Sequence, residues 1–248
     1  MPMNFGNPLA SIPEVVKNLL IINVLMLLAT IVASSFNVDL SELLGLHHWS
    51  SDFFRPHQLV TYMFMHGGLT HLFFNMFALF IFGKVLEQVW GAKKFLVFYL
   101  ICGIGAGIVQ LFVTELRINS IIDQVDPMLY EKVIQDGSAV IHSGKNFVDE
   151  SAGQLNRLIN TSTVGASGSV FGILLAFGML FPNVQLMLIF PPIPMKAKYF
   201  VIIYGALELY LGFANNPNDN VAHFAHLGGM LFGYILIKYW KKNNNIYN

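Results

Sequence analysis

The stretch Thr163-Val-Gly-Ala-Ser-Gly-Ser-Val-Phe-Gly172 places a serine among small residues, where a polar segment becomes an apolar one. Residues 170–181 are apolar, so Ser167 is predicted to be one of the first residues of a helix. Free backbone N–H groups point outward at a helix start and can stabilise a negatively charged oxygen. The pattern favours Ser167 as a candidate nucleophile, with Gly165 and Gly168 allowing a substrate or another backbone to come close.

The same small residues also suit close packing between two helices, which is the more common use of such a sequence in membrane proteins. The Gly-X-Ser-X-Gly elbow of soluble hydrolases is absent, because position 169 is Ser and no strand pattern precedes it. A catalytic interpretation of Ser167 therefore depends on residues elsewhere in the chain.

The composition indicates a membrane protein. Of 248 residues, 55% are hydrophobic and 11% are charged, and the mean hydropathy is +0.58. These values predict a polytopic protein in the lipid bilayer, with one domain over residues 1–248. The net charge is zero and no basic cluster is present, so nothing favours nucleic acid as a partner. Residues 1–13 lack a basic segment, so we expect no cleavable signal peptide.

The hydropathy pattern predicts an all-α fold with six membrane-spanning helices, at residues 15–36, 69–87, 95–113, 167–181, 198–213 and 221–240. Residues 59–65 are apolar but too short to span, and we expect them to form a loop at the membrane interface.

Residues 114–163 interrupt this pattern with a mostly polar insertion. Its apolar pairs, Ile121-Ile122, Met128-Leu129 and Val133-Ile134, predict one or two short amphipathic helices on the surface. We interpret the segment as a tolerated insertion in preference to a substrate-docking element, because the entropy of closing a loop grows slowly with its length.

Lysine and arginine determine the expected orientation. If the N-terminus is cytoplasmic, nine of the fourteen basic residues face the cytoplasm, namely Lys17, Lys84, Lys93, Lys94, Lys196, Lys198, Lys238, Lys241 and Lys242. We therefore expect both termini in the cytoplasm, of the inner membrane if the source is bacterial. The insertion, Ser167 and the starts of the second and sixth spans would then lie near the extracytoplasmic surface.

Two polar motifs are predicted to share this depth with Ser167. In the first, His71 and Asn75 lie four residues apart, so both side chains occupy one helix face and both can donate hydrogen bonds. Polar residues inside a membrane are costly and usually face a cavity or one another. The alternative for Asn75 is a hydrogen bond to a neighbouring helix.

The second motif contains His223 and His226, followed by Gly229 and Gly233. The glycine pair allows a close helix–helix approach, and a histidine held beside a serine on the adjoining helix can act as a general base. A metal site made of His71, His223 and His226 is less favoured, because there is no HExxH motif, no cysteine ligand and no carboxylate at ligand spacing.

Together these residues resemble the rhomboid intramembrane serine proteases, over most of the chain from about residue 55 to residue 239. The Gly-X-Ser-Gly motif of the family matches residues 165–168. Its catalytic histidine, which a Gly-XXX-Gly pair follows, matches His226 with Gly229 and Gly233.

The His-XXX-Asn motif that helps to form the oxyanion hole in that family matches His71 and Asn75. Its Glu-XXX-Gly at the end of the second span matches Glu87 and Gly91, which look like structural residues. Phe171 stands where many members have a tyrosine, and its ring is expected to pack on the catalytic histidine.

The resemblance implies six helices around a water-filled cavity that opens to the outer face. It also implies an endopeptidase that cleaves transmembrane segments of other proteins, with Ser167 as the nucleophile and His226 as the base. Asn75 and His71 would hold the oxyanion, and no metal or organic cofactor is implied.

Two other classes of function remain as alternatives. A rhomboid-like pseudoprotease would bind transmembrane helices without cutting them, and a transporter would show inverted repeats or paired broken helices, which we do not detect. No third carboxylate for a catalytic triad is evident. Glu208 is the acid inside the fifth span, and we interpret it as a partner for a polar face of a neighbouring helix.

Overall fold

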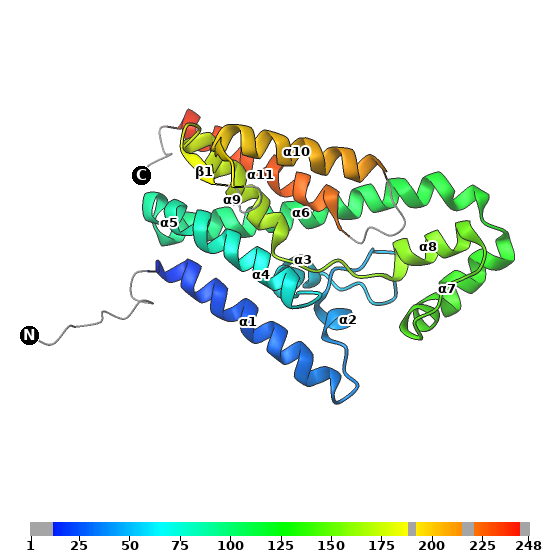
Figure 1. The fold of residues 1–248 in the computed structure, drawn as a ribbon. Helices are drawn as coiled ribbons and strands as arrows, with labels where there is room; N and C mark the ends of the chain where they lie inside the picture. The colour runs from blue at the N-terminus through cyan, green and yellow to red at the C-terminus, as the bar shows by residue number, and fades with distance from the viewer. Residues whose placement is uncertain (1–11, 188–191, 215–220, 244–248) are drawn as a thin grey trace, which may run out of the picture.

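The computed structural model describes residues 12–187, 192–214 and 221–243, most of which are helical. Figure 1 shows a bundle whose long helices run in broadly the same direction. The bundle consists of α1 (Glu14–Ser34), α4 (Leu69–Ala78), a π-helical turn (Leu79–Gly83), α5 (Lys84–Trp90), α6 (Ala92–Ile121), α9 (Ser167–Leu180), α10 (Ala197–Ala214) and α11 (His223–Lys242).

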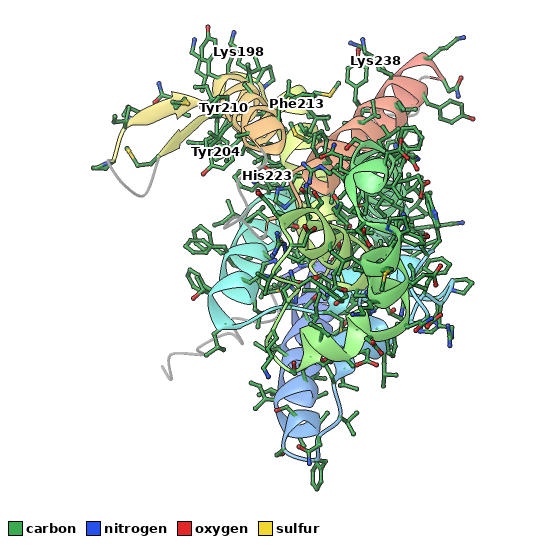
Figure 2. The ribbon with its side chains drawn as sticks, turned by 90° about the vertical axis from the view of Figure 1, so that its right-hand side faces the viewer. Lys198, Tyr204, Tyr210, Phe213, His223 and Lys238 are labelled. Carbon is green, nitrogen blue, oxygen red and sulfur yellow. The ribbon has the colours of Figure 1, made fainter. Side chains whose placement is uncertain are left out.

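A short antiparallel hairpin joins α9 to α10. It consists of β1 (Gln185–Met187) and β2 (Pro194–Lys196), with Leu186 opposite Met195. Figure 2 views the bundle from the side of the insertion and shows the hairpin projecting from it.

Four segments are long and apolar enough to cross a membrane, namely Glu14–Ser34, Leu69–Trp90, Ala92–Gln124 and Ala197–Ala214. Large apolar side chains such as Leu25, Phe73 and Ile202 are exposed on their outer faces, as expected where a helix faces lipid. The prediction of six spans is therefore confirmed for four segments. The apolar helix α9 has 14 residues and contacts α4, α6, α10 and α11, and α11 is not among the four.

Helices α6, α9 and α11 pack together through small residues. A Cβ atom added at Gly229 of α11 would collide with the carbonyl oxygen of Gly168 in α9, and one added at Gly168 would collide with Ala106 in α6. Gly172 in α9 likewise faces Cys102 of α6. Backbones come this close only where side chains are absent, so the two Gly-rich motifs fix the distance between α9 and α11.

Residues 59–65 differ from the prediction. They belong to a helical turn, α3 (Gln58–Thr61), and a 3-10 turn (Tyr62–Phe64). Tyr62, Met63 and Met65 are almost fully buried, and the Tyr62 hydroxyl donates a hydrogen bond to the Gly103 carbonyl at 2.6 Å. The prediction of a loop was wrong, because the segment is helical and these side chains pack against protein, while its position at the membrane interface stays a prediction.

The third span is also longer than predicted, since α6 continues from residue 113 to Ile121. Its polar residues find partners instead of ending the helix. Arg117 donates to the Gly212 carbonyl of α10 at 2.8 Å, and Glu115 accepts a hydrogen bond from Trp49 at 2.9 Å. The insertion therefore begins after α6, at a 3-10 turn (Ile122–Gln124), and not at residue 114.

The insertion folds as two helices, α7 (Pro127–His142) and α8 (Glu150–Asn160), which lie beyond the end of the bundle in Figure 1. They enclose a separate cluster of buried side chains, the insertion core, formed with the end of α6 by Ile118, Ile121, Val125, Val133, Ala152, Leu155 and Ile159. The prediction of one or two amphipathic helices is confirmed.

A row of amide side chains ties the insertion to the rest of the chain. Asn156 donates to Asn146 at 3.0 Å, Asn160 donates to Asn156 at 2.8 Å, and Ser51 donates to Asn160 at 3.4 Å. Ser51 belongs to the connection between α1 and α3, which also contains the short helix α2 (Leu40–Leu44). The insertion is therefore attached to the first loop by hydrogen bonds.

Candidate functional site

Backbone hydrogen bonds to two other segments of the chain fix the residues before α9, and with them the position of Ser167. Leu46 and Thr163 exchange two backbone hydrogen bonds, at 2.9 and 2.8 Å, and the Gly165 N–H donates to the Tyr62 carbonyl at 2.9 Å. Gly165 has a φ of +136°, a conformation that favours glycine. Ser167 is the first residue of α9, so its backbone N–H has no partner within the helix.

Ser167 meets His226 where α9 and α11 cross. The Ser167 Oγ lies 2.8 Å from the His226 Nε2, a hydrogen-bond distance. The ring of Phe171, one turn after Ser167, stacks on the imidazole with centroids 4.1 Å apart and planes inclined by 7°. The contact between Gly229 and Gly168 holds the helices at this separation, and Gly233 packs one turn further along, near the Gly172 Cα.

A carboxylate that the sequence interpretation did not place there contacts the other nitrogen of this histidine. The Glu208 Oε2 in α10 lies 2.8 Å from the His226 Nδ1 and 2.6 Å from the His223 Nδ1. The interpretation of Glu208 as a partner for a polar face of a neighbouring helix is confirmed, since both histidines lie on α11, but its contact with His226 was not predicted. The available signal was a lone acid in an apolar helix, but sequence spacing does not reveal which residue of α11 it faces.

His71 and Asn75 lie on α4, which faces the segment before α9 that contains Gly165. A Cβ atom added at Gly165 would come within 2.9 Å of the His71 Nε2, so this ring lies directly against the loop. The Asn75 amide donates to the His71 carbonyl of its own helix at 3.0 Å. Both side chains line the same cavity as Ser167.

A further histidine, His66, lies beside His71 with ring centroids 5.0 Å apart. It precedes α4 and is 2% exposed. Burial lowers the pKa of His66 to about 4, so its ring is neutral near pH 7. A neutral ring here adds no positive charge to the site.

The cavity has a volume of about 1880 Å³, and residues of both the bundle and the insertion line it. Ser167, His226 and His71 line it from the bundle, and Gln154 and Arg157 line it from α8. The wall of the cavity carries a serine hydroxyl, imidazole rings and side-chain N–H donors. The side chains that line this cavity are of the types that catalyse acyl transfer from a carbonyl compound.

Two groups of side chains in the described ranges have the composition of a metal site. One consists of Glu208, His223 and His226, and the other of Asp39, Glu42 and His142. In the first, the oxygen–nitrogen distances of 2.6 and 2.8 Å are shorter than the roughly 3.3 Å between ligands of a tetrahedral zinc ion. Direct hydrogen bonds explain these distances better than a missing metal does.

The chain matches the model of the rhomboid domain over residues 54–242. A Bacillus subtilis protein whose name assigns it to the rhomboid proteases, YdcA, is 27% identical over 181 residues, which are 72% of this chain and 64% of that protein. Rhomboid protease AarA of Providencia stuartii is 25% identical over 175 residues, covering 70% of this chain and 52% of the relative. The matches thus span between half and two thirds of these relatives. The fold, the membrane helices and the domain match together show that the chain belongs to the rhomboid family.

Proposed function

We propose that this protein is a serine endopeptidase that cleaves other membrane proteins within or beside their transmembrane helices. The observation that carries the proposal is the 2.8 Å contact between the Ser167 Oγ and the His226 Nε2 at the wall of a large cavity. A serine hydroxyl becomes a competent nucleophile when a base within hydrogen-bond distance can take its proton.

In the proposed reaction, the Ser167 Oγ attacks the peptide carbonyl while its proton passes to the His226 Nε2. The tetrahedral intermediate then breaks its C–N bond, and His226 returns the proton to the leaving amine. Water then attacks the ester carbonyl on Ser167 while His226 accepts a proton from the water. His226 gives this proton to the Ser167 Oγ as the ester C–O bond breaks, which releases the acid product and restores both side chains.

The negative oxygen of the tetrahedral intermediate needs donors that are in place before it forms. The backbone N–H of Ser167 at the start of α9 is one, and the side chains of Asn75 and His71 on the facing wall are the others. Rigid donors stabilise this oxygen more than water does, because they need no reorganisation during the reaction.

The bilayer position of the site determines the class of substrate. An intact helix hides its carbonyl groups in hydrogen bonds, so a substrate has to unwind locally before Ser167 reaches it. Transmembrane segments that contain Gly or Pro near one end unwind most easily, because these residues have the lowest helix propensity. The distribution of Lys and Arg supports a site near the extracytoplasmic face, with both termini in the cytoplasm.

The alternative within the family is a pseudoprotease that binds transmembrane helices without cutting them. Such a protein has no need to keep a hydroxyl, an imidazole and their hydrogen bond aligned. The geometry of Ser167 and His226, with Phe171 stacked on the imidazole, favours the protease.

The test is cleavage of a single-span model substrate by the purified protein in liposomes. Ser167→Ala and His226→Ala should each abolish cleavage, and the double variant should be no worse than either single variant, because the two residues act as one unit. A pseudoprotease would show no cleavage with the wild type while still binding the substrate. Substantial turnover by either single variant would contradict the assignment of the pair.

A further inference from the structure

Glu208 is a buried acid whose hydrogen bonds go to imidazole rings. It is 7% exposed, and its neighbours His223 and His226 are 7% and 8% exposed. One carboxylate oxygen, Oε2, lies within hydrogen-bond distance of the Nδ1 atoms of both rings. Figure 2 shows His223 beside α10, the helix that carries Glu208. A buried carboxylate is costly unless such donors compensate it, so this oxygen is held in a defined place.

This contact determines which nitrogen of His226 carries a proton. An ionised carboxylate only accepts hydrogen bonds, so the Nδ1 facing Glu208 has to be the donor. In a neutral imidazole the other nitrogen, Nε2, then has a free lone pair. That nitrogen lies 2.8 Å from the Ser167 Oγ, where a base has to accept the hydroxyl proton.

The same carboxylate acts on the charge that the reaction creates. When His226 takes the proton of Ser167, the ring becomes positive at 2.8 Å from a negative oxygen. This pair is shielded from water, so the attraction is stronger than at the surface. His223 donates to the same oxygen and keeps it from rotating away.

We propose that Glu208 is a positioning residue that extends the Ser167–His226 pair to a three-membered Ser-His-Glu arrangement, with His223 holding the carboxylate in place. This inference rests on the proposed function and adds to it a residue that acts through His226. The sequence motifs of the site contain no such acid.

Other charged or titratable groups lie around His226 on the elements packed against it. His71 faces the site from α4, and His223 lies on the same helix as His226. Arg117 of α6 packs on Phe224 and on the Gly212 carbonyl. Helix α9 contributes the Ser167 hydroxyl and carries no charged side chain. His223 shares the Glu208 oxygen with His226, so a change in pH dependence after substitution of Glu208 reports the loss of this carboxylate from both rings.

The experiment compares Glu208→Gln and Glu208→Asp with the wild type, measuring kcat, KM and the pH dependence of kcat/KM on a model transmembrane substrate. Glu208→Gln should lower kcat by roughly 10³- to 10⁴-fold with KM little changed. The acid limb of kcat/KM should move to lower pH, because the imidazolium loses its negative partner. Glu208→Asp keeps the charge, so its acid limb should stay close to that of the wild type while kcat falls.

Glu87→Gln is the matched control. Glu87 is also buried, but its carboxylate accepts hydrogen bonds from the backbone N–H groups of Val15 and Val16, at 2.9 and 2.7 Å. Its substitution should lower the melting temperature and leave the acid limb unchanged. All rates are normalised to the folded fraction, measured by size-exclusion chromatography in detergent.

An unchanged normalised kcat and acid limb in Glu208→Gln would overturn the inference. If that variant does not fold, a Glu208→Asp variant with wild-type kcat would overturn it equally. Failure of the proposed function gives a different result, since the wild type itself would then not cleave.

Discussion

The bundle around Ser167 and the insertion formed by α7 and α8 have separate cores of different construction. The bundle buries residues such as Phe98 and Ile173 inside while exposing large apolar side chains outside. The insertion buries Val133 and Leu155 and adds a row of hydrogen-bonded asparagines. The bundle is thus suited to lipid on its outer faces, and the insertion to water.

The bundle and the insertion also differ in how well they should tolerate amino-acid substitutions. In the bundle, Gly168 and Gly229 bring the backbones of α9 and α11 into direct contact. The distance between Ser167 and His226 therefore depends on a backbone contact that leaves no space for a side chain. The insertion lines the cavity with side chains of α8, such as Gln154 and Arg157, and with the residues that follow it. Changes in the bundle should therefore affect catalysis itself, whereas changes in the insertion should affect which substrates are cut.

Within the comparison of bundle and insertion, the largest expected effect comes from Gly229→Ala. The added methyl group would collide with the Gly168 carbonyl, so α11 has to move away from α9 and carry His226 with it. A displacement of about 1 Å at a reacting group costs on the order of 100-fold, so kcat should fall at least that far. Gly205→Ala is the control, because its methyl group would meet only the flexible end of Met230. Wild-type turnover by Gly229→Ala would show that the close contact is not required.

Asn75→Ala should have the next largest effect. It removes one proposed oxyanion donor, a loss of roughly 2.7–4 kcal/mol in other hydrolases, or about 100- to 1,000-fold in kcat. The hydrogen bond seen for its amide is to His71 of the same helix, so thermal melting in detergent should change little. A variant that unfolds while its folded remainder keeps full specific activity would favour a packing role for Asn75.

Asn156→Ala tests the insertion in the same way. It removes a buried side chain that is hydrogen-bonded to Asn146 and Asn160, at a cost of about 1–3 kcal/mol. Hydrogen exchange should become faster in α7 and α8 and stay unchanged in α9 and α11. Covalent labelling of Ser167 should persist, while the preference among transmembrane substrates shifts. Loss of labelling would mean that the two cores are not independent.

The smallest expected effect is a pH dependence of stability at His66. The pKa of His66 is about 4 in the folded protein and about 6.5 in the unfolded chain, so between these values the unfolded chain binds more protons. The free energy of unfolding should therefore fall by about 1 kcal/mol between pH 6.5 and 5.5. His66→Gln should reduce this slope, measured by melting in detergent. Equal slopes in both proteins would show that other groups cause any acid sensitivity.

Much of the candidate site follows from local sequence spacing. The i, i+4 pair of His71 and Asn75 and the glycines after His226 place their side chains through helix geometry alone. The structure brings His71, Asn75 and His226 together with Ser167 around one cavity. Their catalytic roles remain predictions.

The parts that sequence did not predict depend on contacts between distant segments. Glu208 contacts His226 because α10 and α11 lie against each other at these two residues. The spacing of residues within one helix does not predict where it contacts another helix. The end of α6 looks like a loop because it contains Glu115 and Arg117, yet both find partners on other segments. Polarity alone therefore cannot locate the end of a helix whose polar residues are paired.

The most direct test of the Ser167 nucleophile is covalent labelling of the purified protein with a fluorophosphonate, with the adduct located by mass spectrometry. The neighbouring Ser169 is an internal control, because it is 1% exposed and its hydroxyl donates to the Tyr99 carbonyl at 2.7 Å. We predict one adduct, on Ser167, which is absent in Ser167→Ala and strongly reduced in His226→Ala. An adduct on Ser169, or labelling that persists in Ser167→Ala, would contradict the assignment, as would a wild type that does not react.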